Sequence, residues 1–171
     1  MQVYPMMHGK APTIVMLILI LLIFSVTYLY FSHLGTATGR ENNNSTALLN
    51  REFSVGRLEI GNSSYNVYIA NTLQLQDLGY MNASGIGNCD GLGRCAGILF
   101  VFGNDSMQCF WMKNTFIPLK QSWISDGVVN YTYSGTPLSQ NSICNIGNMV
   151  LETAPSFPIE YGEVVNYTGH T

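Results

Sequence analysis

Residues 110–119 read FWMKNTFIPL and combine three large aromatic residues, a methionine and one lysine ahead of a proline. Read as a β-strand with period two, the segment has two faces, one with Phe110, Met112 and Asn114 and the other with Trp111, Lys113 and Thr115. A lysine in so apolar a strand must reach solvent, pair with an acid or line a cavity. The segment therefore predicts a strand whose lysine marks either a site or a structural ion pair.

Outward from this segment, short apolar stretches alternate with turn residues from Phe53 onward. The expected strands are 55–60, 65–70, 98–102, 109–113, 121–125, 128–133, 149–152 and 164–167. Turns are expected at 61–64, at 103–105 and at Asp126-Gly127, where the Asp-Gly pair predicts a hairpin. Residues 72–80 form the candidate helix, which Thr72 would cap and Gly79 would end. The pattern predicts one mainly β domain over residues 54–168.

The N-terminal segment is apolar throughout, and residues 14–31 read IVMLILILLIFSVTYLYF. A helix of that length spans about 27 Å, close to the hydrocarbon thickness of a bilayer. We therefore expect a short cytoplasmic tail (1–13), a transmembrane helix acting as signal anchor (14–33), a polar stalk (34–53) and the domain outside. A cleaved signal peptide is the alternative, although its apolar core is normally shorter. Both interpretations place the domain outside the cell membrane.

Two further features agree with export. Asn-x-Ser/Thr sequons, which predict glycosylation, occur at Asn43, Asn44, Asn62, Asn82, Asn104, Asn130 and Asn166. All four cysteines lie in the expected outer part of the chain, where disulfides persist. The net charge of −3 and the absence of a basic run argue against a nucleic-acid partner.

The four cysteines, Cys89, Cys95, Cys109 and Cys144, allow three disulfide pairings. A glycine-containing loop separates Cys89 from Cys95 and can bring its ends together, which favours this pair and leaves Cys109–Cys144. A zinc site is the alternative, but it lacks a C-x₂-C pair and a nearby histidine. We expect no metal and no cofactor.

A series of segments resembles one known family. The series is YNVYIANT (65–72), Gly79-Tyr80-Met81, GILFVF (97–102), FWMKNT with Pro118-Leu119, and Val150-Leu151-Glu152. Together these segments resemble the domain of unknown function 192 family, an uncharacterised family. The resemblance implies a mainly β (α+β) fold, a small curled sheet or partial barrel with one short helix, and it implies no established reaction.

Three departures from this family pattern stand out. Lys120 occupies a position where the family usually has aspartate, and Asn82 one where it usually has arginine. The stretch between Met81 and Gly97 is longer than usual and carries two of the cysteines. If the replaced acid and arginine belong to a polar site, that site is altered here.

Histidine chemistry is not expected in the domain, because His8 and His33 precede it and His170 is next to the C-terminus. A Ser-His or Cys-His pair would therefore lack its base, and we assign no catalytic residue. Glu152 ends an apolar segment, and Lys113 is its expected partner, in a structural ion pair or at a pocket.

The sequence predicts a non-catalytic module that binds a partner protein or a saccharide, or that associates with the cell envelope. The predicted ligand-binding residues are Trp111, Lys113, Asn114 and Glu152. The alternative is a hydrolase or transferase that uses Lys113 and Glu152.

Overall fold

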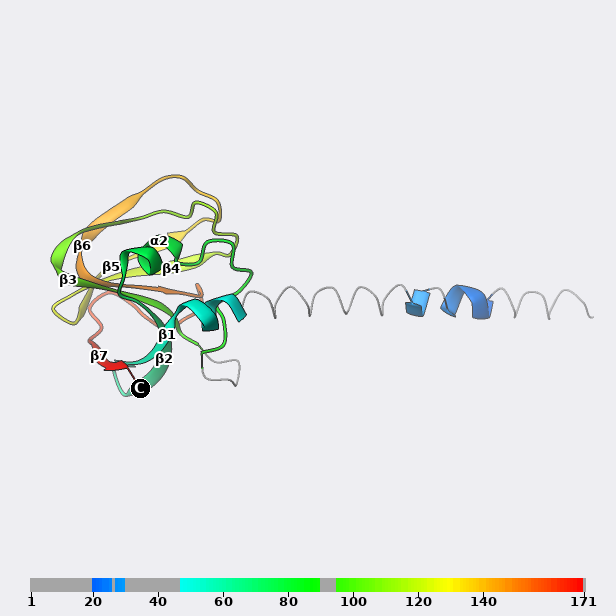
Figure 1. Ribbon diagram of the computed structural model, residues 1–171, viewed down its shortest axis with the longest axis horizontal. Coiled ribbons are helices and arrows are strands. Elements are labelled where there is room, and N and C mark those ends of the chain that lie inside the picture. The colour runs from blue at the N-terminus through cyan, green and yellow to red at the C-terminus, as the bar shows by residue number, and fades with distance from the viewer. Residues whose placement is uncertain (1–19, 26, 30–46, 90–94, 171) are drawn as a thin grey trace, which may run out of the picture. The chain divides into compact units, whose positions relative to one another are not determined.

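The computed structural model describes residues 20–25, 27–29, 47–89 and 95–170 (Figure 1). The chain divides into two units, Met1–Arg40 and Glu41–Thr171. In the first unit, residues 20–25 and 27–29 are helical. Among the described residues, no helix has both the length and the apolar character needed to cross a bilayer. The predicted tail and most of the predicted membrane segment lie outside the described residues.

The second unit is mainly β, as expected. Its strands are β1 (Ser54–Ile60), β2 (Ser63–Ala70), β3 (Gly97–Phe110), β4 (Leu119–Ser125), β5 (Val128–Gly135), β6 (Ile143–Thr153) and β7 (Val165–His170). They form one sheet in the order β5-β4-β6-β3-β2-β1-β7. All neighbours in this order are antiparallel except β2 and β3, which run parallel.

The two edges of the sheet meet, which gives it the strong curl visible in Figure 1. The segment around the start of β7 bonds to the segment around the start of β5, since Val129 N–H donates to the Glu163 carbonyl and Val165 N–H donates to the Gly127 carbonyl. An isolated bridge joins Val128 to Val164 at the same place. The expected curled sheet or partial barrel is therefore confirmed.

Local signals predicted the helix and one hairpin correctly. The helix α2 spans Leu73–Leu78, and the Thr72 side chain caps it by accepting a hydrogen bond from Leu75 N–H. Gly79 ends it with a φ of 45°, a backbone conformation that glycine adopts without steric cost. Asp126 and Gly127 both have positive φ, 49° and 73°, as a tight hairpin turn between β4 and β5 requires.

The strand expected over residues 109–113 is wrong in extent. One long strand, β3, replaces the two that were expected, and the predicted turn at 103–105 is an irregularity within it. β3 ends at Phe110, and Lys113-Asn114 form a turn in which Asn114 has a φ of 57°. This left-handed residue breaks the period-two alternation. The two faces proposed for residues 110–115 therefore do not exist.

Both faces of the sheet are buried, and alternation assigns each side chain to one of them. In β3, Ile98 and Phe100 pack into one hydrophobic cluster while Leu99 packs into the other. In β6, Val150 belongs to the first cluster and Leu151 to the second. Glu152, two residues after Val150, thus points to the face of Phe100.

The folded unit begins before Ser54, so the last part of the predicted stalk belongs to it. Residues 47–52 are helical, and Leu49 and Phe53 are buried in the cluster that contains Phe100. Residues 34–46 of the predicted stalk lie outside the described residues. Two large apolar side chains explain why this segment packs against the sheet and does not remain solvated.

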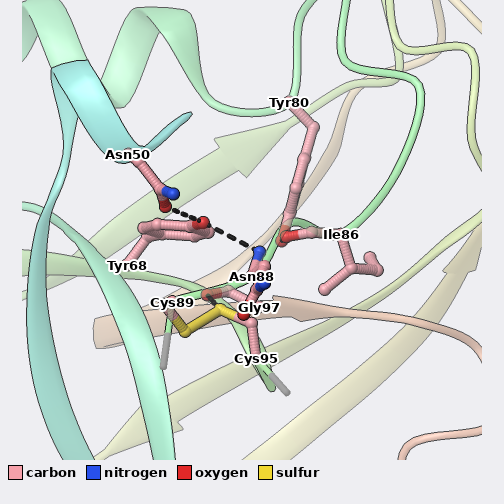
Figure 2. Close-up of a disulfide and its surroundings, with 8 residues drawn as sticks. All are labelled: Asn50, Tyr68, Tyr80, Ile86, Asn88, Cys89, Cys95 and Gly97. Carbon is pink, nitrogen blue, oxygen red and sulfur yellow. Dashed lines mark hydrogen bonds between the residues drawn. A yellow bond between two sulfur atoms is a disulfide. The ribbon is translucent and has the colours of Figure 1, made fainter. Parts of the chain in front are cut away.

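The favoured cysteine pairing is confirmed, with disulfides Cys89–Cys95 and Cys109–Cys144. Figure 2 shows how the first is linked to the fold. The Tyr68 hydroxyl donates to Asn50 Oδ1 at 2.6 Å and accepts from Asn88 N–H at 3.0 Å. One buried tyrosine therefore joins the helical segment 47–52 to the residue before Cys89.

Candidate functional site

A cavity of about 360 Å³ opens beside α2 and the strands β3 and β6. Its volume is near the lower end of the range for small-molecule sites, about 300–1,000 Å³. The side chains that decide its chemistry are Phe100, Phe102, Phe110, Trp111, Lys113 and Glu152. Three of the four residues predicted to bind a ligand therefore line the same cavity.

Glu152 lies at the inner end of the cavity. Its side chain is only 4% exposed, and its strand, β6, is paired on both sides, with Ile98 of β3 and Gln121 of β4 opposite Glu152. Glu152 Oε1 accepts a hydrogen bond of 2.8 Å from Gln121 Nε2. Burial raises the pKa of Glu152 from 4.5 to about 7, because desolvation disfavours the charged form more than the Gln121 bond favours it.

The mouth of the cavity carries Trp111 and Lys113. Trp111 is 48% exposed, and Lys113 Nζ lies 4.9 Å from the centroid of its ring, within the range of a cation–π contact. The expected ion pair between Lys113 and Glu152 is not formed, and among the described residues Glu152 has no ion-pair partner. The reason is the turn after β3, which directs the lysine onto the tryptophan and away from the inner end.

Aromatic rings form the wall between mouth and inner end. Phe110 stacks edge-on against Phe100 at 4.8 Å and against Trp123 at 5.8 Å, measured between ring centroids. Trp123 is fully buried, and its Nε1–H donates to the Gln108 carbonyl at 2.9 Å. Edge-to-face packing of this kind fixes ring orientation, so the apolar wall is preformed.

Asn114, the fourth predicted ligand-binding residue, does not line the cavity. It is exposed, and its carbonyl accepts a hydrogen bond of 2.9 Å from Asn82 N–H. The contact ties the turn after β3 to the segment after α2. Asn114 therefore has a structural position beside the mouth of the cavity.

Sequence reasoning missed two polar groups of the site. Gln121 is 1% exposed and holds the Glu152 carboxyl, and Asp77 of α2 also lines the cavity. Gln121 stands midway between Leu119 and Trp123 in β4, so period-two alternation would have placed a buried amide on the core face. Asp77 carried no comparable signal, because its position depends on where α2 packs.

Lys120, one of the departures from the family pattern, has a structural role. Its Nζ donates to the carbonyls of Phe157 and Ile159 at 3.0 and 3.2 Å, and to Glu160 Oε1 at 2.9 Å. Lys120 is absent from the cavity lining. This lysine fixes the loop between β6 and β7 to β4.

The sequons differ in exposure. Those at Asn62, Asn82, Asn104 and Asn166 are exposed, whereas Asn130 is partly buried and its Nδ2 donates to the Ile146 carbonyl at 2.8 Å. The sequons at residues 43 and 44 lie outside the described residues.

In the part of the chain that the structure describes, no cluster of three or more acidic, histidine or cysteine side chains could hold a metal ion.

The family model for the domain of unknown function 192, described as an uncharacterized ACR, matches residues 57–162. The chain belongs to this family. The match covers the strands and the helix that build the cavity, so the site lies within the family domain. No curated protein matches the chain.

Two solved structures share the fold. A protein from Sinorhizobium meliloti 1021, provisionally named a transcription regulator, has a TM-score of 0.59 at 21% identity over 67% of this chain and 95% of its own. A protein of unknown function from Novosphingobium aromaticivorans DSM 12444 has a TM-score of 0.56 at 22% identity over 66% and 84%. At such identities the likeness shows the fold alone.

Proposed function

We propose that this member of the family is an outward-facing, membrane-anchored module that binds a saccharide in the cavity between Trp111 and Glu152. The observation that carries the proposal is the combination of a preformed aromatic wall with a buried carboxyl at its inner end, which the Gln121 amide behind it holds in place. Sugars need both surfaces, because their C–H faces pack on aromatic rings while their hydroxyls require hydrogen-bond partners.

The membrane anchor and the location rest on the sequence. The uncharged apolar segment 14–31, the sequons and the four paired cysteines support export and anchoring by one N-terminal helix. An outward-facing domain would meet envelope or extracellular glycans. Glycosylation at the exposed sequons is part of the same proposal.

The test is saccharide binding by the full chain, purified in detergent and applied to an array of neutral, acidic and amino glycans. Truncating an aromatic stacking partner removes roughly 1–2 kcal/mol, so Trp111→Ala should weaken binding about tenfold. Phe116→Ala is the matched control, because Phe116 is 57% exposed but does not line the cavity. Failure of every glycan to bind, or equal binding by both variants, would overturn the proposal.

A second function, hydrolysis or group transfer, is favoured by one observation. The pKa of Glu152, about 7, suits a general acid or base near neutral pH. Mass spectrometry of bound oligosaccharides after incubation decides between the two functions. Cleavage that depends on Glu152 and disappears in Glu152→Gln would favour the enzyme, and recovery of intact sugar would favour the binding module.

A further inference from the structure

The inner end of the cavity presents hydrogen-bond acceptors without a cation. Glu152 Oε1 is held by Gln121, while Oε2 lies 3.9 Å from the position that a Cβ on Gly79 would occupy. Because residue 79, which ends α2, is a glycine, this position adds no side chain over the oxygen. Among the described residues, no lysine or arginine pairs with the carboxyl.

The other charged groups around the cavity do not compensate Glu152. Asp77 adds a second acid from α2, and Lys113 is held over Trp111 at the mouth. Tyr80 is buried, and its hydroxyl donates to the Ile86 carbonyl (Figure 2). Burial and the nearby Glu152 carboxyl raise the pKa of Tyr80, so it stays neutral.

We infer that the saccharide bound here is an amino sugar whose free ammonium group pairs with the carboxyl of Glu152. The inference rests on the proposed function and names its ligand class. An ammonium supplies the missing charge and donors for Glu152 Oε2, and an unpaired buried carboxylate is otherwise costly. The rings of Phe100, Phe102 and Phe110 line the same cavity and favour a cation over a neutral group.

Binding of an ammonium should also be linked to proton release. The burial that disfavours a charged Glu152 keeps part of the free protein protonated near neutral pH, whereas the complex requires the carboxylate. Affinity for an amino sugar should therefore fall as the pH is lowered from 7 to 5. Affinity for a neutral sugar should change much less, because a protonated carboxyl still hydrogen-bonds hydroxyls.

The test is isothermal titration of the detergent-purified full chain with glucosamine, N-acetylglucosamine and glucose at pH 7, in buffers of different ionisation enthalpy. A charge-assisted bond is worth roughly 1.5–3 kcal/mol, so glucosamine should bind at least about tenfold more tightly than the two neutral sugars. Its binding should release protons. Glu152→Gln should abolish the preference for glucosamine over the two neutral sugars.

The outcomes separate the inference from the proposed function. If glucose and N-acetylglucosamine bind as tightly as glucosamine, the amino-sugar inference fails while saccharide binding stands. If none of the three binds, the amino-sugar inference fails, and the glycan array decides whether saccharide binding stands. Lys113→Met supplies an independent variant, because removing the cation at the mouth should raise the affinity for glucosamine relative to that for glucose about two- to threefold. Lower glucosamine affinity in that variant would contradict the assignment.

Discussion

The buried carboxyl of Glu152 makes the stability of the domain depend on pH. Its pKa is about 7 in the folded chain and 4.5 is its usual value, so between these pH values the folded chain binds more protons than the unfolded chain. Stability must then fall as the pH rises through this window. At about 1.4 kcal/mol for each pKa unit, the full effect is about 3 kcal/mol.

Urea unfolding of the detergent-purified full chain at pH 4.5, 5.5, 6.5 and 7.5 measures this effect. Ionisation of Glu152 should lower the unfolding free energy of the wild type by about 3 kcal/mol across the series. Glu152→Gln cannot ionise, so its curve should lack this loss and lie above the wild type at pH 7.5. Glu59→Gln changes an exposed acid on β1 and is the matched control.

The comparison with the wild type isolates one group, because other ionisable residues contribute equally to both proteins. A Glu152→Gln variant with the same pH slope as the wild type would refute the argument. That result would mean that Glu152 is solvated or paired in solution, and the basis for its role in the cavity would disappear.

Four further predictions concern other parts of the fold. Lys120→Met should lower the unfolding free energy, measured with urea, by about 1–3 kcal/mol, since two carbonyls and Glu160 lose their donor. Lys120→Asp should lower it further. A loss in Lys120→Met smaller than this range would contradict the assigned role. Tyr68→Phe should lower the unfolding free energy by about 1–2 kcal/mol, because two hydrogen bonds are lost. It should also speed the reduction of Cys89–Cys95 by dithiothreitol, which thiol labelling measures. An unchanged reduction rate would contradict the structural link between Tyr68 and this disulfide. Leu49→Ala should destabilise by about 2–5 kcal/mol, a loss that a solvated stalk would not show. Peptide mass spectrometry should find Asn130 without glycan, because its amide is bonded to a backbone carbonyl, and an occupied Asn130 would refute this.

Sequence reasoning succeeded where the signal was local. The Asp126-Gly127 hairpin, the Thr72 cap and the end of α2 at Gly79 each depend on one or two residues with a defined backbone requirement. The disulfide pairing followed the same logic for Cys89–Cys95, whose short loop closes easily. Most strand positions were recovered for the same reason, since alternation is visible within a few residues.

Sequence reasoning failed where the position of a side chain depends on residues far away in the sequence. The turn at Lys113-Asn114 was missed because a period-two reading assumed that residues 110–115 continue β3. The buried state of Glu152 follows from its position in β6 between β3 and β4, a neighbourhood that no local pattern reveals. Gln121 is an intermediate case, because alternation in β4 predicts which face of the sheet its side chain lies on but not that it bonds to Glu152.

The most direct test of the saccharide site is a ¹⁵N NMR titration of the detergent-solubilised full chain with glucosamine. The protein has only two tryptophans, Trp111 and Trp123, and only Trp111 lines the mouth of the cavity. We predict that the Trp111 indole and Gln121 side-chain amide resonances shift together and saturably, while the hydrogen-bonded Trp123 indole shifts less. Saturable shifts confined to other parts of the domain, with both Trp111 and Gln121 unchanged, would contradict it.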